Sequence, residues 1–116
     1  MRNNSADRQR LFHILEAIKQ IEIFTQNFNP NVFDNNLVRS ACIFQLEIIG
    51  EAVNKISKKI KDKYQDIDWI NITGLRNIIA HEYWGIDYSI VWSIISFELP
   101  KLKANIENII VKEKLE

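Results

Sequence analysis

One short segment concentrates side chains that could do chemistry, since Arg76, Asn77, His81 and Tyr83 lie within eight residues. Arginine carries a fixed cation whose planar donors suit phosphate oxygens. Histidine gives or takes a proton near neutral pH, and asparagine and tyrosine add uncharged hydrogen-bonding groups. No cysteine or carboxylate cluster lies nearby, so this chemistry requires no metal ion. The residue types favour phosphodiester cleavage by general acid–base catalysis, with Arg76 stabilising charge on phosphorus.

Helical spacing keeps these side chains away from the buried stripe of their segment. At about 100° per residue, Tyr83 falls about 20° from Arg76, on the same face. Asn77 and His81 fall one turn apart on an adjoining face. The core side is left to apolar residues, Ile72, Leu75 and Ile79. Two copies of such a helix across a symmetric dimer would bring two arginines and two histidines into one cleft.

A structural interpretation of the same residues stays open. A histidine near a helix end can cap carbonyl groups, and Arg76 can pair with an acidic neighbour such as Glu82 or Glu51. Neither role involves a substrate. Spacing alone does not choose between these roles and catalysis.

Long helices must position this segment, because only three glycines and two prolines interrupt 116 residues. The first helix is expected from an N-cap at Ser5, with Asp7 in its first turn, to about Asn29-Pro30. Its apolar stripe is Leu11, Ile14, Leu15, Ile18, Ile21 and Phe28. A loop follows over residues 31–36. A second helix is expected from about residue 35 to 61, with two apolar stripes that indicate burial on two sides.

Two further helices are expected in the second half of the chain. Asp68 caps one that runs from about Trp69 to residues 84–85 and carries the reactive segment. Asp87 caps the last one, which Pro100 should kink or split. Neither an internal repeat nor an alternating strand pattern is present. The sequence therefore predicts an all-α, antiparallel bundle of four to five helices that forms one domain, residues 1–116, and assembles as a symmetric homodimer.

Composition restricts the kinds of binding site that the protein could have and its expected location. Fifteen basic and fifteen acidic residues give zero net charge, so any nucleic-acid site must be a local patch. Cys42 is the only cysteine, which excludes an intrachain disulfide and a cysteine-based zinc site. The first ten residues lack the apolar core of a signal peptide, and no apolar run reaches the length of a membrane span. The expected location is the cytoplasm.

Lysines supply the densest basic cluster, with Lys55, Lys58 and Lys59 as candidate RNA-binding residues. A solvated helix end is the alternative meaning of such a run. Trp84 directly follows the reactive segment and is a candidate base-stacking residue. Glu47 and Glu51 lie one turn apart and could line the same cleft or pair with Arg76.

The string from Arg76 to Tyr83 resembles the R-x-x-x-x-H-x-Y signature of the HEPN superfamily. Residues 10–18, 45–57 and 91–95 are similar to its HepT branch, and together the similar stretches run from about residue 7 to about residue 110. This resemblance implies an all-helical homodimer that acts as a metal-independent ribonuclease, with no cofactor, and as the toxin of a two-gene module. It also implies that Arg76, His81 and Asn77 are catalytic. Transfer RNA is the substrate class that the family type suggests.

The same resemblance implies a partner, a minimal, MntA-like nucleotidyltransferase that acts as antitoxin. It transfers AMP from ATP to the tyrosine of the motif, here Tyr83. Some members of the family are described only as substrate-binding subunits of nucleotidyltransferases, so a non-catalytic binding module is the alternative function. A plain dimeric helical scaffold is a third.

Overall fold

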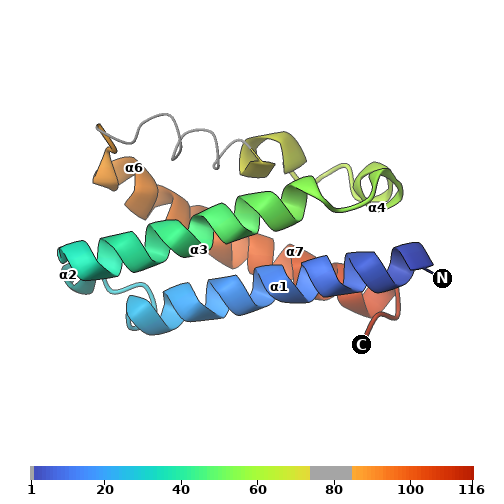
Figure 1. The fold of residues 1–116 in the computed structure, drawn as a ribbon, viewed down its shortest axis with the longest axis horizontal. Helices are drawn as coiled ribbons and strands as arrows, with labels where there is room; N and C mark the ends of the chain where they lie inside the picture. Colours follow the sequence, from blue (N-terminus) through green and yellow to red (C-terminus); the bar gives the residue numbers. More distant parts are fainter. Residues whose placement is uncertain (1, 74–84) are drawn as a thin grey trace.

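The computed structural model describes residues 2–73 and 85–116, and its regular elements there are all helical. Three long helices, α1 (Arg2–Phe24), α3 (Asn36–Asn54) and α7 (Leu99–Lys112), form its body (Figure 1). Helix α1 runs antiparallel to α3 and packs against both α3 and α7. The described ranges contain no strand, so the expected all-α bundle is confirmed.

The apolar periodicity of the sequence becomes the core between these three helices. Fully buried side chains come from α1, α3 and α7 in turn: Leu11, Ile14, Ile18 and Ile21; Cys42, Leu46, Ile49 and Val53; Leu99, Ile106 and Ile109. Burial of each large aliphatic side chain contributes about 1.5–3 kcal/mol. The second helix was expected to carry a further apolar stripe, which consists of Leu37, Ala41, Phe44, Ile48 and Ala52. This stripe is only partly buried, since Leu37 and Phe44 are exposed whereas Ala52 is buried.

Both ends of the first helix differ from the prediction. Helix α1 already begins at Arg2, so Ser5 lies inside it and is not the N-cap. It ends at Phe24, because Gln26, Asn27 and Phe28 all adopt positive φ angles of 51–64°. The buried Thr25 holds this turn: its hydroxyl donates to the Ile21 carbonyl at 2.7 Å and accepts from the Phe28 amide at 3.0 Å. The stop signal is therefore this left-handed turn at residues 26–28, which precedes Pro30.

The expected loop at residues 31–36 contains a short helix, α2 (Pro30–Phe33). Pro30 suits its first turn because a proline there needs no amide partner, and the Asn29 side chain accepts from the Asn31 amide at 3.0 Å. Helix α3 then starts as predicted, with the Asn35 side chain capping the amides of Leu37 and Val38 at 2.9 and 3.1 Å.

The predicted single helix over residues 35–61 is wrong, because the chain divides into α3 and α4 (Lys58–Lys63). Ser57 is the N-cap of α4 and accepts from the Ile60 amide. Asp7 of α1 accepts from the Ser57 amide at 2.9 Å and from its hydroxyl at 2.6 Å. Asp7 is only 4% exposed, so it fixes the break in the helix rather than complementing the first turn of α1.

We expect Asp7→Ala to destabilise the fold by about 2–3 kcal/mol, because a charged acceptor is lost and the part-buried Ser57 amide loses its partner. Urea denaturation followed by circular dichroism measures the change. The matched control is Asp62→Ala, which removes an exposed carboxylate paired with Lys58 and should change stability by less than about 1 kcal/mol. Equal midpoints for the two variants would show that the Asp7–Ser57 contact does not hold the break.

The helix caps predicted at Asp68 and Asp87 are confirmed. Asp68 accepts from the Asn71 amide at 3.2 Å, and residues 69–73 are helical. The helix was expected to end near residues 84–85. Residues 74–84 lie outside the described ranges, so this end stays a prediction. Asp87 caps α6 (Tyr88–Ser93) through the Ser89 amide at 2.9 Å. The disruption expected at Pro100 takes the form of a π-helical turn, η1 (Ile94–Glu98), directly before α7.

The C-terminal end of the chain is fixed to α4 and α1. The Tyr64 hydroxyl and the Lys63 ammonium both contact Glu113 at 2.7 Å. The hydrogen bonds from Lys63 and Tyr64 lower the pKa of Glu113, whereas burial and Glu113 raise the pKa of Tyr64 to about 12. Arg8 donates from Nε to the Leu115 carbonyl at 2.6 Å. Tyr64 is therefore a buried, protonated phenol that ties the end of α4 to the segment that follows the last helix.

Candidate functional site

The reactive segment lies between the two described parts of the chain. Arg76, Asn77, His81, Tyr83 and Trp84 all fall outside the described residues, so their expected geometry stays a prediction. The structure does define the chain on either side of them. The helical residues 69–73 lie over the C-terminal half of α3 in Figure 1, and α6 lies near its other end.

A tryptophan anchors each of these flanking stretches to the rest of the fold. Trp69 donates from its indole nitrogen to the Tyr64 carbonyl at 3.0 Å and is buried. Trp92 of α6 packs on the buried Phe33 of α2, with ring centroids 5.0 Å apart. Both tryptophans therefore serve in packing. The core fixes the chain shortly before and shortly after the reactive segment.

A groove between α1 and α3 collects charged residues from both helices. It encloses about 320 Å³ and is lined by Arg10, His13, Phe44, Glu47, Ile48, Glu51, Ala52 and Lys55. The structure thus brings Glu47 and Glu51 together with Lys55 in one groove. The expected pairing of Glu51 with Arg76 involves a residue outside the described ranges and stays a prediction. Lys55 and Glu51 form an ion pair at 3.8 Å. Since the lining carries both signs of charge, the groove suits mixed polar contacts better than a bare phosphate chain.

Two groove residues had no signal in the sequence analysis. Arg10 and His13 come from α1 and meet the carboxylates of α3 only because these helices pack side by side. Their spacing of three residues places them on one face of α1. Helical periodicity could have shown that the two residues share a face of α1. It could not have identified the facing helix.

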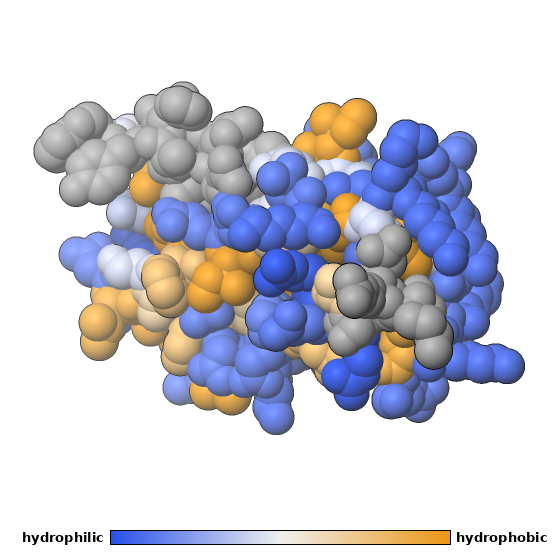
Figure 2. All heavy atoms as spheres, turned by 45° about the vertical axis from the view of Figure 1, so that its right-hand side comes forward, coloured by the Kyte–Doolittle hydropathy of each residue, from blue (hydrophilic) through white to orange (hydrophobic). Residues whose placement is uncertain are grey.

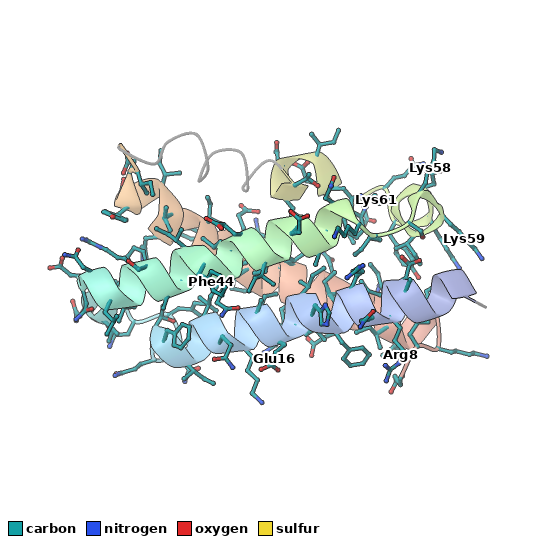
Figure 3. All side chains as sticks on the ribbon, viewed as in Figure 1. Arg8, Glu16, Phe44, Lys58, Lys59 and Lys61 are labelled. Atoms are coloured by element: carbon teal, nitrogen blue, oxygen red, sulfur yellow. The ribbon has the colours of Figure 1, made fainter. Side chains whose placement is uncertain are left out.

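The lysine cluster is more strongly neutralised than its sequence suggests. Lys58 pairs with Asp62 at 2.6 Å, Lys63 pairs with Glu113, and Lys61 donates to the Asn54 carbonyl at 3.4 Å. Figure 3 places Lys58, Lys59 and Lys61 together at the α4 end of the molecule, away from Phe44. Figure 2 turns that end forward and shows hydrophilic residues over much of it. These ion pairs fit a solvated helix end, and RNA contact by Lys55, Lys58 and Lys59 stays a prediction.

Cys42 offers no nucleophile at neutral pH. It is fully buried, and burial raises the pKa of its thiol to about 11. A thiol with that pKa stays protonated near neutral pH and reacts poorly. Among the described residues, no group of three or more His, Cys, Asp or Glu side chains could hold a metal ion. The described helices also include none that is long and apolar enough to cross a bilayer.

Comparison with known proteins identifies the family. The model of the family described as Ribonuclease HepT-like matches residues 14–109, a range that includes the whole of the reactive segment. The chain belongs to the HepT-like ribonuclease family. The resemblance of the chain to the HepT branch is thereby confirmed.

Several HepT-like relatives are similar over most of their length. One protein of Methanocaldococcus jannaschii, named as a candidate RNase, is 41% identical over 98 residues, 84% of this chain and 90% of the relative. Another from the same organism, with the same designation, is 41% identical over 86% of this chain and 84% of its own length. A Thermococcus cleftensis protein named as a candidate HepT ribonuclease is 34% identical over 83% of this chain and 88% of its own. No solved structure gives a significant match.

Proposed function

We propose that this chain is the toxin of a two-gene toxin–antitoxin module and cleaves RNA without a metal ion. The observation that carries the proposal is the HepT-like family match, because it spans the Arg76–Tyr83 motif together with both flanks. The relatives named as RNases support RNA as the substrate class. Transfer RNA is the form of RNA that we propose to test first.

The chemistry follows from the residue types in the motif. His81 removes the proton of a ribose 2′-hydroxyl, whose oxygen attacks the adjacent phosphorus. Arg76 stabilises the added negative charge on the phosphorane, and Asn77 provides a neutral hydrogen bond beside it. The bond to the 5′-oxygen of the next nucleotide then breaks, and that oxygen takes up a proton from the partner subunit's His81. The products carry a 2′,3′-cyclic phosphate and a 5′-hydroxyl.

Control of this activity is proposed to act on Tyr83. An MntA-like nucleotidyltransferase transfers AMP from ATP to its hydroxyl and releases pyrophosphate. The attached phosphate then lies near Arg76 and competes with substrate phosphate, while the adenosine fills the cleft. Inhibition therefore needs no change of fold.

A growth assay separates this function from its alternative. Expression of the chain alone should arrest growth and fragment cellular RNA, and co-expression of its cognate nucleotidyltransferase should restore both. A non-catalytic binding subunit would leave growth and RNA intact when it is expressed alone. That result would contradict the ribonuclease function and favour the substrate-binding alternative.

The homodimer is expected to form through the outer stripe of α3. Phe44 is 60% exposed there and borders the α1–α3 groove, and Leu37 lies two turns earlier on the same stripe. Burial of this stripe against a second copy would explain why α3 is apolar on two sides. It would also bring the grooves of the two subunits close together.

We predict that Phe44→Asp weakens the dimer at least tenfold without a loss of helix content, because a desolvated charge is costly in an apolar interface. Sedimentation at micromolar concentration measures the change. Phe97→Asp is the control, since Phe97 is 67% exposed on η1 and lies on a different helix. A monomeric wild-type protein, or a dimer that only Phe97→Asp disrupts, would contradict this interface.

A further inference from the structure

A cluster of rings and one cation lies where the chain re-enters the core after the reactive segment. It consists of Phe33 from α2, Arg39 from α3, and Tyr88 and Trp92 from α6. Phe33 is buried, and Trp92 is half-buried against it. Tyr88 differs from them because it is 37% exposed. Its ring is therefore the one in this cluster that solvent, or a ligand, can reach most easily.

The guanidinium of Arg39 lies against the Tyr88 ring. The Cζ atom of Arg39 lies 4.4 Å from the Tyr88 ring centroid and 5.7 Å from that of Phe33. Arg39 also pairs with Asp34 at 3.3 Å, but the Asp34 side chain is 86% exposed, so water weakens this attraction. The guanidinium thus lies against the ring, and Asp34 offsets its positive charge only weakly. The Nε atom of Arg39 is buried without a hydrogen-bond partner.

We propose that Tyr88, supported by Arg39, is a base-stacking subsite for single-stranded RNA. A flat, partly exposed ring is the surface on which unpaired bases stack, and each such stack contributes about 1–3 kcal/mol of binding. The positive charge behind the ring attracts the phosphates on either side of the stacked base. Tyr88 follows His81 by only seven residues, so a short RNA strand could reach both. The proposal rests on the ribonuclease function.

A second arginine–aromatic pair provides a matched comparison. Arg8 lies 4.7 Å from the Phe12 ring centroid, and Phe12 is also 37% exposed. Arg8, however, donates from Nε to the Leu115 carbonyl and ties the first helix to the C-terminus. Phe12 is also more than sixty residues from the reactive segment along the sequence. The two rings therefore share exposure and a cation but differ in their relation to the motif.

The test measures binding of a fluorescein-labelled single-stranded oligouridylate by fluorescence anisotropy. The protein is the full chain carrying His81→Ala, so that the RNA stays intact. Tyr88→Leu should weaken binding about tenfold, whereas Tyr88→Phe, which keeps the ring, should bind within about twofold of the parent. Phe12→Leu should have no effect. Thermal unfolding of each variant shows whether the fold is kept.

Photocrosslinking gives a readout that needs no change at Tyr88. The same oligonucleotide with 5-iodouridine should crosslink to the peptide that contains Tyr88. Unchanged binding by Tyr88→Leu, or crosslinks that all fall elsewhere, would overturn the subsite. If the wild-type chain then still cleaves RNA, the ribonuclease function stands without it. A wild-type chain that neither binds nor cleaves RNA would overturn both.

Discussion

Replacing His81 by alanine is expected to lower the rate of RNA cleavage by about two to four orders of magnitude, because a well-placed general acid–base group contributes that much. Arg76→Ala is expected to lower it by about two to three orders of magnitude through the loss of charge stabilisation at phosphorus. Both variants should also stop inhibiting growth. Initial rates of cleavage on a defined RNA measure the effect.

The fold should survive both substitutions, since Arg76 and His81 belong to none of the three helices α1, α3 and α7 whose apolar side chains form the described core. Circular dichroism and thermal unfolding check this. Lys101→Ala is the matched control, because it removes an exposed cation of α7 that lies outside the motif and outside the candidate RNA-binding lysines, and it should leave the cleavage rate unchanged. A double variant of Arg76 and His81 that cleaves RNA as fast as the wild type would show that the catalytic assignment is wrong.

Tyr83→Phe is expected to abolish neutralisation while it leaves at least part of the toxicity. The phenylalanine keeps the ring but lacks the hydroxyl oxygen that attacks the α-phosphorus of ATP. Incubation of the wild-type protein with ATP and the cognate nucleotidyltransferase should add groups of about 329 Da, the mass of an adenylyl unit. The variant should gain none and should still arrest growth when the antitoxin is present.

The structure indicates which other tyrosine could accept AMP in place of Tyr83. The chain has three tyrosines, Tyr64, Tyr83 and Tyr88. Tyr64 is a poor acceptor, because it is buried, donates its hydroxyl proton to Glu113 and has a pKa of about 12. Tyr88 is exposed and is the control acceptor. Unchanged adenylylation of Tyr83→Phe that disappears in Tyr88→Phe would assign the modification to Tyr88 and remove the regulatory role of Tyr83.

Local signals in the sequence predicted the helix starts that follow Asn35, Asp68 and Asp87, but not the start of α1 at Arg2 or that of α4 at Lys58. Asn35, Asp68 and Asp87 cap the helices that follow them because a capping side chain bonds to amides two or three residues away. The break at Ser57 could not be predicted in the same way. It depends on Asp7, fifty residues earlier, which becomes a neighbour only after α1 packs on α3.

The candidate site, like the helices, could be predicted from the sequence only in part. Its reactive residue types stand in one segment, and membership of the HepT-like family, which the sequence indicated, is confirmed by the family match. The α1–α3 groove and the stacking of Arg39 on Tyr88 were not visible, because each joins residues from helices far apart in the chain. Spacing along one helix identifies which residues share a face. It does not identify the surface that faces them.

The central claim is that this chain cleaves RNA by attack of the ribose 2′-hydroxyl, without a metal ion. The most direct measurement incubates the purified wild-type protein with total RNA in EDTA and determines the chemistry of the new ends. The account predicts cleavage at the wild-type rate, with 2′,3′-cyclic phosphate and 5′-hydroxyl ends that are absent with the Arg76 and His81 double variant. Intact RNA in EDTA, or cleavage that needs added Mg²⁺ and leaves 5′-phosphate ends, would contradict it.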